Sequence, residues 1–132
     1  MEDRPQRAVR VKLINKVVVG GKHVEYHFKV QGIQKRSFTI IDRYSNMRKI
    51  YEKLKKQIKH FKKNLGAKFP KKNIWGEGFV KDRENKLENF WNALLSDEEY
   101  SQHTIVKEYL SKFWDPSQPC YQVFDMDPQS YV

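Results

Sequence analysis

In the stretch FTIIDRYSNMRKIYEKL, residues 38–54, the spacing of the apolar residues changes, and the expected architecture follows from that change. Phe38 and Ile40 alternate as in a β-strand, which we place at Lys35 to Ile41. From there onward the apolar spacing is that of a helix, with a stripe made by Met47, Ile50, Tyr51, Leu54, Ile58, Phe61 and Leu65. The sequence therefore predicts a strand that leads directly into one long helix.

Two further strands are predicted before this stretch. Residues 9–19 and 23–30 are rich in β-branched and aromatic side chains, and the second run alternates at Val24, Tyr26, Phe28 and Val30. Gly20 and Gly21 separate the two runs. Tight hairpin turns need positive φ, which glycine adopts without steric cost, so we expect an antiparallel hairpin here.

Helices are predicted after the stretch. Residues 64–81 contain three Gly and one Pro without periodicity, so we expect an ordered loop, with Phe79 and Val80 as core residues that close it onto the second helix. Asp82 is the expected N-cap of a second helix. The apolar positions of this helix are Leu87, Phe90, Trp91, Leu94 and Leu95, and those of a shorter third helix are Ile105, Val106, Tyr109, Leu110 and Phe113.

Strands followed by helices predict an α+β fold, with a three-stranded antiparallel β-sheet packed against a helical subdomain of three to four helices. The length of 132 residues suits one domain, which we place at residues 1–114. Residues 115–132 carry three Asp and no Lys or Arg, and two Pro interrupt their start. We expect this segment to be an irregular acidic tail.

The charge of the chain points to a polyanionic partner. The net charge is +10, and because the tail is acidic the first 114 residues carry about +13. Such a balance suits nucleic acid or the anionic face of a membrane, and composition does not choose between them. A single Cys, the absence of a membrane-spanning apolar run and an amino terminus without signal-peptide character lead us to expect a cytoplasmic protein.

Catalytic and metal-binding patterns are missing from the sequence. The string HVEYH at residues 23–27 lies on a predicted strand, where its two His stand about 13 Å apart, too far for one metal ion. No nucleophile elbow, phosphate-binding loop or dinucleotide fingerprint occurs. We therefore expect neither an enzyme, nor a metal site, nor a cofactor.

Three segments together resemble the PX (phox homology) domain, a family of phosphoinositide-binding modules that includes sorting nexins. DRYSNM at 42–47 is similar to the family's Arg-Tyr-Ser-x-Phe signature, and FPKKNIWG at 69–76 to its Pro-rich segment. The third is the R-x-x-x-L-x-x-F pattern at 83–90. Their order and their positions on strand end, loop and helix start extend the resemblance over nearly all of residues 7–114.

The resemblance implies a headgroup site of four residues. Arg43 would take the 3-phosphate, because a planar guanidinium can donate two hydrogen bonds to one phosphate. Tyr44 would support the inositol ring with its aromatic face. Lys72 would bind the phosphate that joins inositol to glycerol, and Arg83, at the start of the second helix, would donate to the 4- and 5-hydroxyls.

The same resemblance places membrane-inserting side chains at Ile74 and Trp75. A buried Trp side chain removes roughly 150–250 Å² from water, which corresponds to several kcal/mol as an upper bound. Two residues depart from the family pattern. Asp42 stands where a second basic residue is common and is expected to put a negative charge beside the phosphate site, and Lys71 replaces the second Pro of the loop.

These residues predict a membrane-targeting module that binds phosphatidylinositol 3-phosphate on endosomal or vacuolar membranes in trafficking. A PX-fold protein-interaction scaffold with little lipid affinity stays open as an alternative. A basic nucleic-acid-binding module is the weaker one, because the chain has no DNA-binding motif and no basic strand surface with interleaved aromatics. Tyr121 to Phe124 matches a four-residue pattern that adaptor and coat proteins bind, and it gives the tail a candidate partner.

Overall fold

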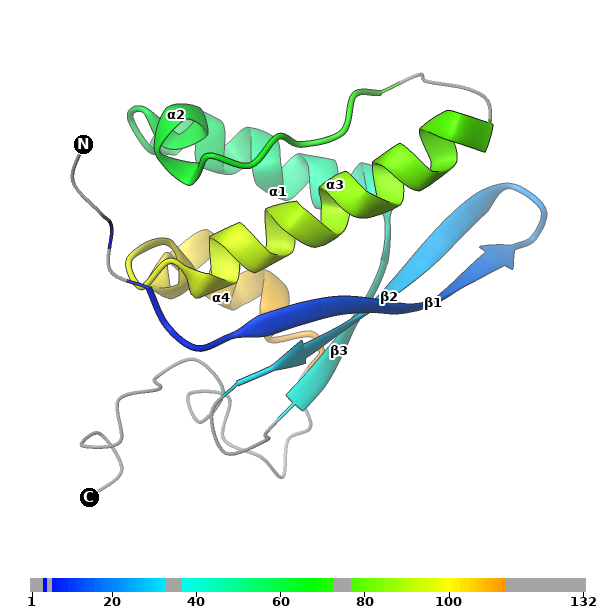
Figure 1. Ribbon diagram of the computed structural model, residues 1–132, viewed down its shortest axis with the longest axis horizontal. Coiled ribbons are helices and arrows are strands. Elements are labelled where there is room, and N and C mark those ends of the chain that lie inside the picture. Colours follow the sequence, from blue (N-terminus) through cyan, green and yellow to red (C-terminus); the bar gives the residue numbers. More distant parts are fainter. Residues whose placement is uncertain (1–3, 5, 33–36, 73–76, 114–132) are drawn as a thin grey trace.

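The computed structural model describes residues 4, 6–32, 37–72 and 77–113, which form the predicted α+β fold (Figure 1). A three-stranded antiparallel sheet has the order β1 (Arg10–Val19), β2 (His23–Gln31) and β3 (Ser37–Arg43). The helices are α1 (Tyr44–Gln57), α2 (Phe61–Leu65), α3 (Glu77–Ser96) and α4 (Thr104–Leu110), with a short 3₁₀ turn, η2 (Tyr100–Gln102), before the last.

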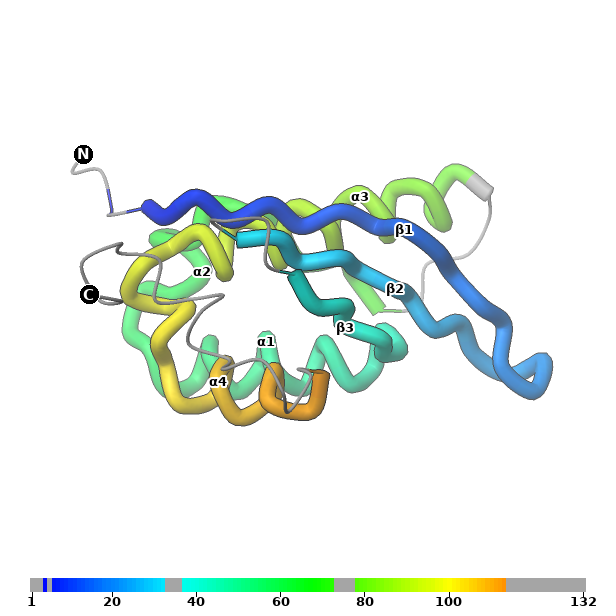
Figure 2. The backbone as a smooth tube through the Cα atoms, turned by 90° about the horizontal axis from the view of Figure 1, so that it is seen from below, coloured from blue at the N-terminus to red at the C-terminus, as the bar shows by residue number. Residues whose placement is uncertain are grey.

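The β1–β2 hairpin forms at the Gly-Gly pair, as predicted. Gly20 and Gly21 both have positive φ, 59° and 63°, and the Lys22 N–H donates to the Val19 carbonyl at 3.1 Å. Positive φ at both central residues gives a turn whose twist matches that of the paired strands. The tip of the hairpin projects beyond the helices (Figure 2).

The core lies between the sheet and the helices. One face of β2 and β3 is buried through Tyr26, Phe28, Val30, Phe38 and Ile40, which confirms the predicted alternation. The predicted helical positions meet them: Leu87, Phe90, Trp91, Leu94 and Leu95 of α3 have no exposed surface. Each such side chain contributes roughly 1.5–3 kcal/mol through burial, so this interior fixes where the loops and helix starts are held.

The predicted single long helix from Met47 to Leu65 is wrong, because the chain turns between α1 and α2. Ile58 is extended and His60 has a left-handed backbone with φ 61°. The turn brings Phe61 into the core, where its ring lies 6.2 Å from Tyr51 and 5.1 Å from Tyr100. A tertiary requirement, the burial of Phe61, therefore outweighs the helical spacing of the sequence.

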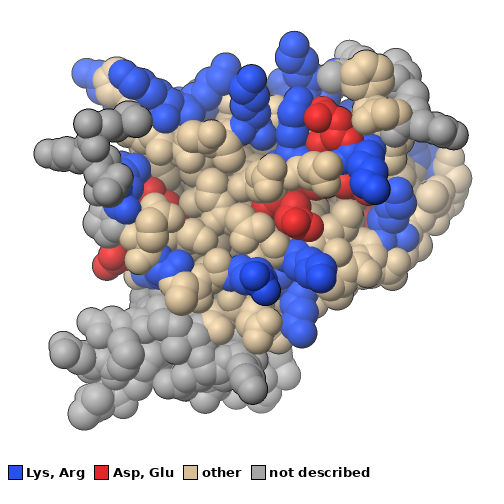
Figure 3. All heavy atoms as spheres, in the orientation of Figure 1, with Lys and Arg blue, Asp and Glu red and all other residues tan. Residues whose placement is uncertain are grey.

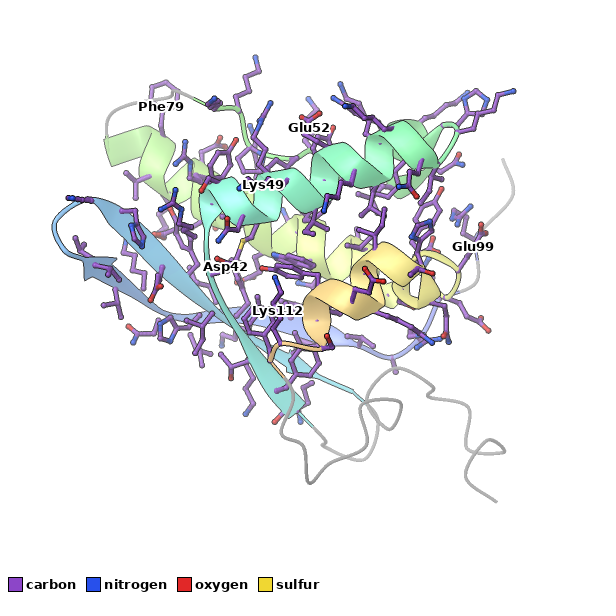
Figure 4. All side chains as sticks on the ribbon, turned by 180° about the vertical axis from the view of Figure 1, so that it is seen from behind. Asp42, Lys49, Glu52, Phe79, Glu99 and Lys112 are labelled. Carbon is purple, nitrogen blue, oxygen red and sulfur yellow. The ribbon has the colours of Figure 1, made fainter. Side chains whose placement is uncertain are left out.

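The start of α3 also differs from the prediction. The helix begins at Glu77, so Asp82 lies inside it and forms an ion pair with Lys86 at 2.9 Å instead of capping the helix. Phe79 and Val80 were predicted to be core residues, but they are 50% and 47% exposed. The early start of the helix explains both differences, because its first turns lie at the end of the molecule toward which the hairpin tip projects, on the far side from α4 (Figures 1 and 4).

A buried tyrosine that the apolar spacing did not predict connects the amino-terminal segment to the helices. Tyr100 is 2% exposed, and the Arg4 guanidinium lies 4.0 Å from the centre of its ring. Arg4 also forms ion pairs with Asp97 and Glu99. These contacts hold the start of the chain against the turn that precedes α4.

Side chains of α3 occupy the free edge of β1. Asn92 accepts a hydrogen bond from the Val11 N–H and donates one to the Val11 carbonyl, both at 2.7 Å. Glu88 accepts from the Leu13 N–H at 2.8 Å, and the Ser96 hydroxyl donates to the Val9 carbonyl at 3.1 Å. Over residues 9–13, α3 therefore supplies the hydrogen bonds that a further strand would otherwise make.

We predict that Asn92→Ala destabilises the domain by about 2 kcal/mol, because both backbone groups of Val11 lose their partner in a partly buried place. Urea unfolding followed by circular dichroism measures the change. Asn64→Ala is a matched control, since its single 3.3 Å bond to the Tyr100 hydroxyl should contribute only about 0.5 kcal/mol. Equal losses in the two variants would show that the edge contacts carry no special weight.

Candidate functional site

Arg43 occupies the junction of strand and helix that the sequence predicted. It is the last residue of β3 and, with φ −95° and ψ 159°, the N-cap of α1. Its exposed side chain donates from Nε to the Ser45 hydroxyl at 2.6 Å. The outer nitrogens of the guanidinium form no hydrogen bond or ion pair within the described part of the chain, and they can face a phosphate.

The Asp42 carboxylate accepts hydrogen bonds from its own backbone neighbour and from two helices. Its Oδ1 accepts hydrogen bonds from the Arg43 N–H at 2.8 Å and from Asn46 Nδ2 at 2.7 Å. Its Oδ2 accepts from the Tyr109 hydroxyl at 2.8 Å, on the side of the junction that faces α4 (Figure 4). Burial, together with this carboxylate, raises the pKa of Tyr109. Asp42 therefore connects β3, α1 and α4, and its charge is shared with donors inside the fold.

Tyr44 joins the loop after α2 to the start of α1. Its hydroxyl donates to the Pro70 carbonyl at 2.6 Å and accepts from the Arg48 guanidinium at 3.0 Å. Its ring stacks on Phe69 with 5.5 Å between ring centres. Arg48 was missed in the sequence, although its position four residues after Tyr44 on a helix places the two side chains on one face.

Arg83 lies in the second turn of α3 and reaches back to Tyr44, with 4.1 Å between its guanidinium carbon and the ring centre. It also donates to the Lys71 carbonyl at 3.4 Å. Burial raises the pKa of Tyr26, and the nearby Arg83 charge acts in the opposite direction. Arg83 thus contacts the Tyr44 ring and the Lys71 carbonyl, and its charge lies near Tyr26.

The structure therefore brings Tyr44, Arg83 and the backbone of the loop together, next to Arg43. Lys72 follows Lys71 on this loop and is exposed. Among the residues that the structure describes, none of Arg43, Lys72 and Arg83 forms an ion pair with an acid. Ile74 and Trp75 lie outside the described residues.

No group of three or more His, Cys, Asp or Glu among the described residues is placed to hold a metal ion. Within the same residues, no helix is both long and apolar enough to cross a bilayer.

At the start of α1, Arg43 and Arg83 lie near Tyr44 without an ion pair to any acid that the structure describes, an arrangement that suits an anion. The sequence matches the PX domain family over residues 30–113, and the chain belongs to this family. PX domains are in general phosphoinositide-binding, membrane-targeting modules and are typically not enzymes. A designed CISK-PX domain solved by X-ray crystallography has a similar fold, with 20% identity and a TM-score of 0.63. The similarity covers 76% of this chain and 96% of that one. No curated protein matches the sequence.

We predict that Asp42→Ala destabilises the domain by about 1–3 kcal/mol, because three donors lose their acceptor. Tyr109→Phe removes only one of these bonds and should cost about 1 kcal/mol. Urea unfolding of both single variants and the double variant measures the coupling between the two side chains. Additive losses would contradict a direct Asp42–Tyr109 interaction.

Proposed function

We propose that this domain binds phosphatidylinositol 3-phosphate on endosomal or vacuolar membranes and acts there in membrane trafficking. In this proposal Arg43 binds the 3-phosphate, Tyr44 supports the inositol ring and Lys72 binds the phosphate that leads to glycerol. Arg83 donates to the 4- and 5-hydroxyls. The domain comprises residues 1–114, and the tail, residues 115–132, offers Tyr121 to Phe124 to an adaptor or coat protein.

One observation carries the proposal: Arg83 and Tyr44 lie in contact, 4.1 Å from guanidinium carbon to ring centre, although they come from different helices. Arg83 would exchange this cation–π contact for hydrogen bonds to the inositol hydroxyls. The exchange needs only side-chain motion, because the Tyr44 hydroxyl is fixed by Pro70 at 2.6 Å. Arg43 has no acidic partner among the described residues, so a phosphate has no ion pair to break there.

The first turns of α3 extend the proposed membrane contact. Phe79 and Val80 are about half exposed, and they follow the segment that contains Ile74 and Trp75. Phe79 lies at the end of the molecule where the β1–β2 hairpin tip also lies (Figure 4). Large apolar side chains exposed in neighbouring positions mark interaction sites. We therefore add Phe79 and Val80 to Ile74 and Trp75 as side chains that enter the membrane.

Binding by charge alone would not distinguish one lipid headgroup from another. Each Lys or Arg close to an anionic leaflet contributes about 1 kcal/mol, and the attraction fades beyond the Debye length of about 10 Å at 0.1 M salt. The basic surface thus orients the domain, the headgroup site selects the lipid and the apolar side chains slow dissociation. Loss of selectivity together with steep salt dependence would favour a nucleic-acid-binding module, and absence of lipid binding would favour a protein-interaction scaffold.

We predict that Arg43→Ala weakens binding to vesicles containing phosphatidylinositol 3-phosphate by roughly 10- to 100-fold, the effect of losing a charge-assisted, two-bond contact. Sedimentation of the vesicles with the protein measures the change. Lys29→Ala, which removes the same charge from an exposed position of β2, should change binding less than about threefold. Undiminished binding by Arg43→Ala would overturn the proposed headgroup site.

We predict that Phe79→Ala combined with Val80→Ala shortens the residence time on these vesicles, with little effect on binding of the soluble headgroup, inositol 1,3-bisphosphate. Surface plasmon resonance on captured vesicles gives the dissociation rate, which should rise roughly tenfold. Ile14→Ala is the control, because this β1 residue is equally exposed at 52% but lies away from the start of α3. The membrane role of α3 fails if both proteins dissociate alike.

A further inference from the structure

A depression of about 590 Å³ opens where the chain turns from α1 to α2, at the opposite end of α1 from Arg43. Its volume lies within the roughly 300–1,000 Å³ of small-ligand sites. It belongs to no part of the headgroup site described above. Its walls combine an apolar floor with basic side chains, so the chemistry of a ligand can be argued from them.

The charged side chains that line the depression are all positive. Four of its lining residues are lysines and none is acidic: Lys55, Lys62, Lys63 and Lys68. Lys55 pairs with Glu52 at 3.3 Å, whereas the other three lysines have no ion pair with any acid that the structure describes. Lysines gathered without acids repel one another, so the folded state bears a cost that a bound anion would remove.

The backbone holds these lysines in place. His60 and Gly66, at the two ends of α2, both have left-handed backbones, with φ 61° and 77°. His60 takes this conformation without being glycine, which costs of order 1 kcal/mol and persists only where the surrounding structure requires it. Between them Phe61 is 1% exposed and anchors the short helix in the core. The core therefore fixes the position of α2, and the long side chains of Lys62 and Lys63 on this helix line the depression.

The depression and the headgroup site are connected by the segment that follows α2. Gly66 to Lys68 line it, and the same segment continues to Lys71, whose carbonyl accepts from Arg83. Lys and Arg side chains gather along the upper edge of the molecule, over α2 and this segment (Figure 3). The loop that follows α2 thus borders both the depression and the proposed headgroup site.

We propose that the α1–α2 depression is a second anion-binding site that takes a multiply phosphorylated ligand. Several lysine ammonium groups on long stems suit several phosphates, since each is a point charge with three rotatable donors. A singly charged anion would leave most of these donors unused. The same chemistry occurs in soluble inositol polyphosphates and in the headgroups of polyphosphorylated lipids.

The test uses the full chain carrying Arg43→Ala, so that the headgroup site is silenced, and inositol hexakisphosphate as the probe in calorimetry at 0.15 M salt. Adding Lys62→Ala, Lys63→Ala and Lys68→Ala should weaken binding roughly 10- to 100-fold. The control removes three exposed lysines elsewhere, Lys12, Lys29 and Lys107, with the same change in net charge, and should weaken it less than about threefold. Equal losses in the two triple variants, or no binding before they are made, would overturn the site.

A second arm identifies the source of the ligand. The same proteins are sedimented with vesicles containing phosphatidylinositol 4,5-bisphosphate, with and without free inositol hexakisphosphate. Loss of vesicle binding in the depression variant, with retention in the control, assigns the site to a lipid headgroup. Calorimetric binding without a difference on vesicles assigns it to a soluble ligand. Circular dichroism and urea unfolding establish that both triple variants are folded, as expected for exposed side chains.

Discussion

The hydrogen bonds of the Asp42 carboxylate fix the position of Arg43 and, with it, of the proposed headgroup site. It accepts from the first backbone N–H after it, from Asn46 on α1 and from Tyr109 on α4. A carboxylate with partners on three elements fixes the angle at which β3 passes into α1, and Arg43 stands at that point. From sequence position alone, the negative charge of Asp42 is expected to disfavour a phosphate. In the structure, Asp42 instead fixes the backbone from which the Arg43 guanidinium extends.

The strands and the helical interior were predictable because they follow simple periods. Phe28 and Ile40 alternate into a buried face, and Leu87 with Trp91 follows the spacing of a helix. The turn at His60 was not predictable, since nothing local forbids a helix there and the reason for it is the distant contact of Phe61 with Tyr100. Burial decided between two local structures that the sequence allowed equally.

At the start of α3, residues typical of a loop form a helix. Gly78 and the scattered apolar residues around it are typical of a loop, and Asp82 is a common N-cap residue, yet the helix begins at Glu77. Apolar character at Phe79 was interpreted as burial, but exposure depends on where the element ends relative to the sheet. For the proposed headgroup site, the motifs supplied the candidate residues. The contact of Arg83 with Tyr44 was not predictable, because it joins residues from separate helices whose distance only the fold sets.

The closure of β1 by α3 has a consequence for how these molecules meet one another. An edge strand with free N–H and C=O groups is a template for pairing with another chain, and proteins often block it with charged or bulged residues. Here Asn92 fills the hydrogen-bonding groups of Val11, and Glu88 that of Leu13. A membrane surface concentrates such domains side by side, and the first half of β1 gives a neighbouring copy few free groups to pair with. The helix thus blocks edge-to-edge pairing along this part of β1.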